Sequence, residues 1–288
     1  MLNIEDVRKK LQRNPEPVEV KEIREHIINT FNKLEFIEES HQYFLPQEDG
    51  TKRELLSVSV TCHQFEPDVD WDMIAAKKAL KLGIPVEQLK RQWFENNHQA
   101  TNMGTGVHLY GENLMYMVLD QEDKICDVIK PQYEAGYLFP HSQREKAALK
   151  YYEDLFLIDE IYPVMPETRV YMGINDKFPV NNPFAGTFDI LHAMKVKGQW
   201  KLLLHDFKTN ADLYKDYARD HHIMLKAPFD YLYDEPVSLY TLQLSCYEMA
   251  LRQIGYDVID RRLIWLKDDG TYEKIAVPSV VDTLAKIL

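Results

Sequence analysis

The sequence predicts an α/β protein in which helices flank a central mixed β-sheet and the N-terminal region is helical. Two observations carry this prediction. Apolar residues recur at helical spacing through most of residues 1–156, whereas strand-length segments that alternate or run apolar follow between residues 167 and 208. A helical pattern and a hairpin pattern then close the chain. At 288 residues, 45% of them hydrophobic, the chain can bury the core of one large domain or two small ones.

Composition and charge narrow the functional classes. The 46 acidic and 34 basic residues give a net charge of −12, which argues against a protein that coats nucleic acid by bulk charge but leaves room for an enzyme with a locally basic groove. No apolar run approaches the ~18 residues that cross a bilayer, and the polar N-terminus shows no signal peptide. Three widely spaced cysteines exclude a disulfide scaffold and a Cys-x-x-Cys pair and favour a reducing compartment. We therefore expect a cytoplasmic protein that does not bind membranes.

The N-terminal half is predicted to hold short helices and one hairpin. Apolar spacing predicts helices over residues 4–11 and 20–34, which are separated by prolines at positions 15 and 17. The β-rich segments HQYFL and ELLSVSVT flank a turn-like stretch, residues 47–50, and predict a hairpin. Further helices are expected over residues 71–82, from Pro85, from near Gly104, and over residues 142–156.

The C-terminal half is predicted to alternate strands with helices. Strands are expected over residues 167–172, 184–194 and 200–208, and the last two form a hairpin that turns at residues 197–199. Residues from about 210 to 237 lack periodicity, and a structureless connection of this length is often functional. The chain is completed by a helix over residues 239–254, a hairpin that turns at residues 268–270, and a short helix after Pro278.

Two aspartates and a lysine lie in the predicted hairpin. Asp206 follows Asp189 after 17 residues, so pairing of the two strands brings their carboxylates together near one end of the sheet. Asp206 and Lys208 share a face of their strand, while Phe207 points to the other face. Two carboxylates and the Phe207 carbonyl can hold a hard divalent cation, which activates water for phosphodiester hydrolysis, and a lysine can orient or deprotonate that water. The alternative is an ordinary surface ion pair between Asp206 and Lys208.

Basic residues gather in the predicted helices on either side of Gly83. A stripe of this kind could hold phosphates, although a solvated helix face is the commoner account. The residues are Lys77, Lys78, Lys81, Lys90 and Arg91.

Several segments together resemble the PD-(D/E)XK nuclease superfamily, in its RecB-like and phage-exonuclease branch. GTFDI, a hairpin and HDFKT resemble motifs II and III, and the segments around them follow in the order that the branch has. These are SVSVT, which resembles a strand near the start of these nucleases, GTGVHLYGENL, PETRVY, MLKAPFDYLYDEP and TLQLSCYEMAL. The match covers about residues 55–265. The resemblance implies a restriction-endonuclease-like core over residues 55–288, on which a helical and hairpin region, residues 1–54, is packed.

The resemblance also implies a role for each matching residue, with Mg²⁺ or Mn²⁺ as the cofactor. Lys208 is the catalytic lysine, and Gln243 and Tyr247 border the site and the nucleic acid. The implied metal ligands are His108, Asp189, Asp206 and the carbonyl of Phe207.

Two further carboxylates are candidates for the same site. Glu112 is four residues after His108, so both lie on one helix face, and Glu112 could replace or support the histidine. Glu167 is a candidate for the edge of the site. A histidine in a helix is more often a packed or surface residue than a metal ligand. The assignment of His108 as a ligand therefore depends on the resemblance.

The implied function is that of a metal-dependent deoxyribonuclease, an exonuclease of phage recombination or replication, with DNA as its partner. A structure-specific endonuclease is one alternative. A non-catalytic DNA-binding or assembly protein on the same fold is another, and the intact set of Asp189, Asp206 and Lys208 argues against it. Assembly into a homo-oligomer stays open, and so does a single-strand annealing or binding protein as a further partner. The sequence has no Walker A loop and too few cysteines for an iron–sulfur cluster.

Overall fold

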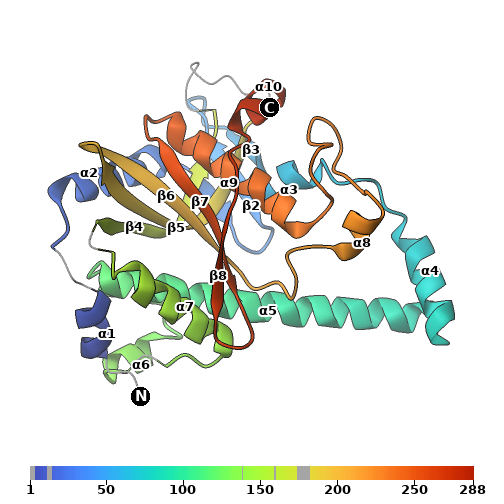
Figure 1. Ribbon diagram of the computed structural model, residues 1–288. Coiled ribbons are helices and arrows are strands. Elements are labelled where there is room, and N and C mark those ends of the chain that lie inside the picture. Colours follow the sequence, from blue (N-terminus) through green and yellow to red (C-terminus); the bar gives the residue numbers. More distant parts are fainter. Residues whose placement is uncertain (1–3, 12–14, 138, 159, 174–181) are drawn as a thin grey trace.

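A computed structural model describes residues 4–11, 15–137, 139–158, 160–173 and 182–288 (Figure 1). Within these residues, helices cover both faces of a mixed eight-stranded sheet, as the sequence predicts. The strands are β1 (Glu35–Ile37), β2 (Gln42–Pro46), β3 (Lys52–Ser57), β4 (Ile161–Tyr171), β5 (Phe184–Val196), β6 (Gln199–Lys208), β7 (Val258–Leu266) and β8 (Tyr272–Ala276). The helices are α1 (Ile4–Leu11), α2 (Val18–Phe31), α3 (Val58–His63), α4 (Trp71–Leu82), α5 (Val86–Val118), α6 (Lys130–Glu134), α7 (Gln143–Leu155), α8 (Asp216–Asp220), α9 (Pro236–Arg252) and α10 (Val281–Ile287).

The sheet opens along one edge of β5. The strand order is β1-β2-β3-β5-β6-β7-β8, and β4 pairs with the other edge of β5. β3 runs parallel to β5 and pairs with it as far as Ala185, whereas the antiparallel β6 pairs with it from Ile190 onward. Ala185 also pairs with β4, and Leu191 pairs with both β4 and β6, so β3 and β6 share one edge. Among the described strands, residues 186–189 therefore have a neighbour only on the β4 side.

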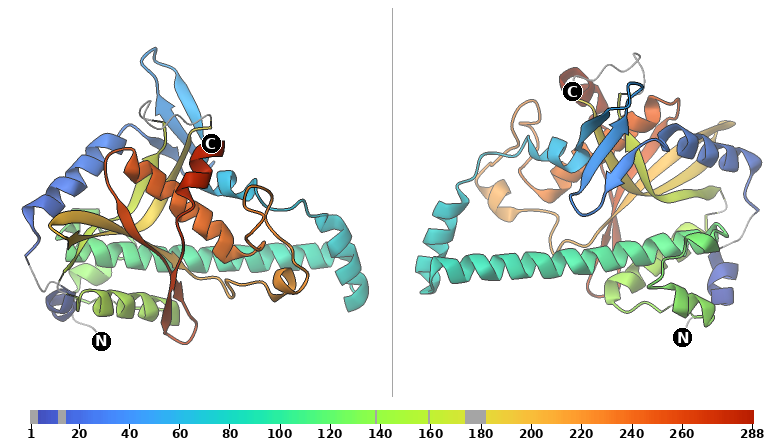
Figure 2. Two further views of the ribbon diagram at one scale, coloured as in Figure 1. Left: turned by 45° about the horizontal axis from the view of Figure 1, so that its top comes forward. Right: turned by 180° about the vertical axis from the view of Figure 1, so that it is seen from behind.

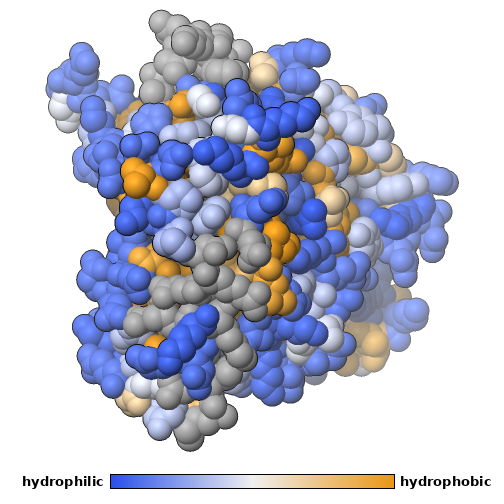
Figure 3. Space-filling model, turned by 60° about the vertical axis from the view of Figure 1, so that its left-hand side comes forward, coloured by the Kyte–Doolittle hydropathy of each residue, from blue (hydrophilic) through white to orange (hydrophobic). Residues whose placement is uncertain are grey.

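Each face of the sheet has its own hydrophobic cluster. Helices α2, α3, α9 and α10 contribute to the cluster that contains Phe188, and α1, α5 and α7 contribute to the one that contains Phe207. Full burial of each such side chain stabilises the fold by ~1.5–3 kcal/mol. Two further views show that α5 lies along its side of the sheet and projects well beyond it (Figure 2). The side where α1 and α2 lie is mostly hydrophilic, with hydrophobic residues in small separate patches (Figure 3).

Most predicted elements form with shifted ends. The largest shift is in β4, which begins at Ile161 rather than near residue 167. The hairpin between β5 and β6 turns where predicted, because Lys197 and Gly198 have φ of +50° and +81°, the left-handed pair that a tight hairpin turn requires.

Residues 58–63 are helical, so the prediction of a strand through SVSVT is wrong. The strand ends at Ser57, whose hydroxyl accepts a hydrogen bond of 3.1 Å from the amide of Val60. This side chain caps α3, and Val58 and Cys62 are buried on the face that packs against α9. Capping and burial outweigh the strand propensity of the valines.

A single helix replaces the two helices predicted from Pro85 and from Gly104. α5 has 33 residues, and Gly104 and Gly106 lie inside it. A glycine in a helix interior costs ~1 kcal/mol relative to alanine, but burial of Val107 and Leu114 in the core offsets this cost. The part of α5 from residue 94 to residue 103 is exposed on every side.

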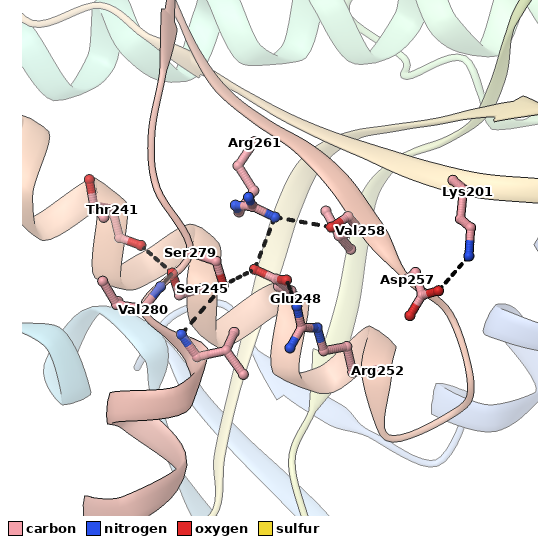
Figure 4. A network of polar contacts seen from close by, with 11 residues as sticks. Lys201, Thr241, Ser245, Glu248, Arg252, Asp257, Val258, Arg261, Ser279 and Val280 are labelled. Carbon is pink, nitrogen blue, oxygen red and sulfur yellow. Dashed lines mark hydrogen bonds and ion pairs between the residues drawn. The ribbon is translucent and has the colours of Figure 1, made fainter. Parts of the chain in front are cut away.

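A buried carboxylate fixes α9 against β7 and the C-terminal segment (Figure 4). Glu248 is fully buried and forms ion pairs with Arg252 at 2.6 Å and Arg261 at 3.2 Å. The hydroxyl of Ser279 donates a third contact of 2.8 Å. Removing one partner of a buried charge typically costs ~3–5 kcal/mol, so this network holds α9, the helix that carries Gln243, in a defined position.

Candidate metal centre

Side chains from three elements meet at the opening of the sheet. His108 of α5, Glu167 of β4 and Asp189 of β5 each place one ligand atom within 4.8 Å of the others. His108 Nδ1 lies 3.2 Å from Asp189 Oδ2 and 3.6 Å from Glu167 Oε1. Two carboxylates and an imidazole at this separation form a candidate site for a divalent cation. The sequence predicts His108 and Asp189 as ligands and Glu167 at the edge, and the structure brings the three together.

The register between β4 and β5 explains why the two carboxylates meet. Pro166 pairs with Ile190, so the next residue of β4, Glu167, lies across from Asp189. Glu167 also has φ of +37°, in the left-handed region that a residue with a Cβ atom rarely adopts. Strain of this kind persists where the surrounding structure fixes it, and it is common at functional sites.

A close approach of α5 to β6 carries His108 to the cluster. A Cβ atom added to Gly111 would lie 2.4 Å from the ring of Phe207, so only a glycine allows this contact. His108 is three residues earlier on the same helix, and its ring meets the Phe207 ring edge-on with centres 6.3 Å apart. Gly111 therefore determines how closely α5 approaches β6, and with it the position of His108 relative to the carboxylates.

Asp206 and Lys208 occupy the other face of β6, as their spacing predicts. Their side chains form an ion pair, and Lys208 Nζ lies 4.1 Å from the centre of the Tyr240 ring. Asp206 is 1% exposed, and apart from the Lys208 contact its carboxylate oxygens have no hydrogen-bond partner among the described residues. Phe207 points to the opposite face, and its amide donates a hydrogen bond of 2.7 Å to Asp189 Oδ2.

Asp189 lies where the side-chain alternation of β5 changes. Phe188 packs toward α9, with its ring centre 6.3 Å from that of Tyr247, whereas Ile190 belongs to the cluster on the α5 face. Residues two apart on a regular strand share a face, so β5 is irregular at this point. Asp189 thereby contacts His108 on one side and the backbone of β6 on the other. Asp206 stays on the α9 face, outside the group of three ligand atoms.

Charge pairing dominates the electrostatics of His108 and Asp189. Burial lowers the pKa of His108, but Asp189 and then Glu167 outweigh it and hold that pKa well above its usual value. Burial raises the pKa of Asp189, but His108, Lys208 and the Phe207 amide bring it below its usual value. In the metal-free protein, a proton on His108 thus supplies positive charge to the cluster.

Burial and repulsion from Asp189 disfavour the charged form of the two remaining carboxylates, Asp206 and Glu167. Burial, followed by repulsion from Asp189, raises the pKa of Asp206 to about 6. Burial and Asp189 likewise raise the pKa of Glu167 to about 7, although His108 opposes the shift. A buried carboxylate whose one described partner is Lys208 and a second one held in a strained backbone fit a cation with oxygen ligands. The residues present therefore fit Mg²⁺ or Mn²⁺, which His108, Glu167 and Asp189 would hold, while Asp206 lies outside this group and interacts electrostatically with Asp189.

A hollow opens onto this cluster. A cavity of about 690 Å³ contacts all the residues predicted for substrate binding, and a second one of about 410 Å³ shares Glu112, Glu167 and Arg169 with it. Gln243 Nε2 donates a hydrogen bond of 3.0 Å to the Tyr247 hydroxyl in the first cavity. Glu112 lines both cavities and accepts a hydrogen bond of 2.8 Å from the hydroxyl of Tyr116.

Tyr240 and Arg169 are site residues that the sequence prediction missed. Tyr240 lies on the same face of α9 as Gln243 and Tyr247, at spacings of three and seven residues, so helical periodicity could have identified it. Arg169 lines both cavities and is two residues after Glu167 on β4, so strand periodicity could have identified it.

Comparisons with models of known protein families and with curated proteins found no match. Among the helices of the described residues, none combines the length and the apolar character that a membrane crossing requires.

Proposed function

We propose that the protein is a divalent-metal-dependent deoxyribonuclease with a restriction-endonuclease-like core of the PD-(D/E)XK type. The observation that carries this proposal is the meeting of His108, Glu167 and Asp189 beside the buried ion pair of Asp206 and Lys208. The chain order also supports it: α5 precedes the antiparallel strands β4, β5 and β6, and α9 leads to β7, which runs parallel to β6.

The residues of the site divide the work of hydrolysis between them. A bound Mg²⁺ or Mn²⁺ would polarise the phosphate and supply an activated water. Lys208, held between Asp206 and Tyr240, would orient that water and stabilise the negative charge that develops on the phosphate. Arg169 and Gln243 line the cavity where the sugar-phosphate backbone would lie.

Two experiments test the proposal: the metal dependence of DNA cleavage, and the effect of substituting Lys208. Cleavage of DNA should stop in excess EDTA and return with Mg²⁺ or Mn²⁺. Lys208→Ala should lower kcat by on the order of 10²-fold or more, with a much smaller change in DNA affinity. Lys201→Ala is the matched control, because Lys201 lies near the other end of β6 and pairs with the surface residue Asp257 at 2.5 Å. Cleavage that persists in EDTA, or an active Lys208→Ala variant, would contradict the proposal.

A further inference from the structure

An arm formed by residues 71–103 projects from the body of the molecule (Figures 1 and 2). α4 packs against the outer turns of α5 through the buried residues Ala75 and Ala79, and an ion pair of 2.7 Å between Asp72 and Lys90 joins the two helices. The arm is therefore a defined pair of helices, although residues 94–103 of α5 contact solvent on all sides.

One face of α5 runs from the candidate metal centre out along the arm. Phe94, Thr101, Thr105 and Glu112 are separated by close to two, one and two helical turns, so they share this face, on which His108 also lies. The cavity of about 690 Å³ is lined by Thr101 and Thr105 as well as by the metal-centre residues. Phe94 stands about 21 Å from His108 along the helix axis. The face therefore offers a continuous path from the cavity to the ring of Phe94.

The chemistry of the arm differs from that of the whole chain. Phe94 is 71% exposed, and Arg91 precedes it by about one turn on an exposed part of α5. Residues 71–103 contain five lysines or arginines and three acidic residues, in a protein with a net charge of −12. Among the described residues, no ion pair engages Lys77, Lys81 or Arg91. A cation that is unpaired among the described residues, Arg91, about one turn from an exposed aromatic ring matches a polyanion that has flat, stackable bases.

We propose that this face of the arm binds a single-stranded nucleic-acid segment that continues from the strand in the metal centre, with a base stacked on Phe94 and a phosphate against Arg91. The choice of this occupant rests on the proposed function. The strand is single because the bases of a duplex cover one another's faces and leave none for the ring. The small polar side chains at Thr101 and Thr105 leave room for the backbone between the two ends of the path.

Binding of a fluorescent single-stranded oligonucleotide, of a length within the ~4–16 nucleotides typical of such sites, tests the proposal. The measurement uses the full chain with Lys208→Ala, in Ca²⁺, so that cleavage does not interfere. Phe94→Leu should weaken binding by about fivefold or more, the scale of one base–aromatic stack, while Phe94→Trp should keep it. Arg91→Gln should reduce the slope of log affinity against log salt by about 0.7. Lys21→Gln on α2, at the other end of the molecule, is the charge-matched control and should change neither quantity.

The outcomes separate this inference from the proposed function. Unchanged binding by Phe94→Leu, or no binding by the parent chain, would overturn the inference even if the enzyme cleaves DNA. Loss of binding on Phe94→Leu would support it even if no cleavage is found. If Phe94→Leu binds normally and Phe94→Ala instead dissociates a dimer in sedimentation, the face is an interface between two copies of the chain and the inference is wrong.

Discussion

Asp206 has the least favourable surroundings of the carboxylates at the metal centre. It is almost fully buried and Asp189 repels its charge, which Lys208 and, more weakly, His108 offset. This burial rules out an ordinary surface ion pair between Asp206 and Lys208. A cation held beside Asp189 would relieve the repulsion, whereas a buried ion pair with no metal nearby would gain nothing from one. The two interpretations of Asp206 therefore differ in what its loss does to the stabilisation by metal.

Asp206→Asn removes the repulsion from Asp189 but leaves the buried ammonium of Lys208 without its ion-pair partner, so the metal-free protein should lose stability. In the wild type, a metal at about a hundredfold excess over Kd stabilises the folded state by ~2.7 kcal/mol, a shift in Tm of several degrees. Asp206→Asn should abolish most of this shift in thermal melts with and without Mn²⁺. Asp260→Asn is the control, because Asp260 of β7 pairs with His205 of β6 and with Arg262 of its own strand, and the metal shift should survive in this variant. An intact shift in Asp206→Asn would show that this carboxylate takes no part in metal binding.

A second residue-scale prediction concerns His192. Burial, followed by repulsion from His205 and Lys274, holds the pKa of His192 well below its usual value. Below about pH 6.5 the unfolded chain binds a proton at this residue that the folded chain does not bind, so stability falls as the pH drops through that value. His192→Gln should reduce the slope of unfolding free energy against pH, by up to ~1.4 kcal/mol per pH unit, between about pH 6.5 and 5. Urea unfolding across this range measures it, and an unchanged slope would contradict the assignment.

At the scale of elements, the close packing of α5 on β6 makes glycine substitutions informative. Gly111→Ala should lower stability by ~1–3 kcal/mol and reduce cleavage, because its Cβ atom would meet the Phe207 ring and push His108 away from the carboxylates. Gly106→Ala, one and a half turns earlier on the same helix, meets nothing within 4 Å and should instead raise stability by ~0.5–1 kcal/mol. Chemical denaturation of both variants checks the prediction, and equal effects would argue against the close approach.

Elements set by local sequence could be predicted, and elements set by distant contacts could not. The helix over Trp71–Leu82 has its cap, Asp70, and its terminating Gly83 beside it in the sequence. The continuity of α5 through Gly104 depends on the core beneath its inner half, which the local pattern does not contain. In the same way, Asp206 and Lys208 could be placed by strand periodicity, but the position of Glu167 depends on a positive φ and on the register with β5.

At the scale of the whole molecule, the choice between exonuclease and endonuclease can be decided with intact DNA substrates. The resemblance to phage exonucleases implies that the proposed nuclease would start from an end, so linear duplex should be degraded while covalently closed circles survive. Gel analysis of both forms in one reaction is the measurement, and a nicked circle provides an internal check on entry at breaks. Efficient linearisation of closed circles would favour the endonuclease alternative.

The opening of the sheet between β3 and β6 has a consequence for when the sheet can fold during protein synthesis. β3 and the half of β5 that it pairs with are more than a hundred residues apart in the chain, and β6 is made later still. Pairings of such long sequence range form slowly and only after the last partner is available. A nascent chain that has only reached Asp189 holds the three ligand residues of the candidate metal centre but not β6, which carries Asp206 and Lys208, or α9, which carries Gln243. Translation itself delays the onset of any activity at this site until the sheet can close around it.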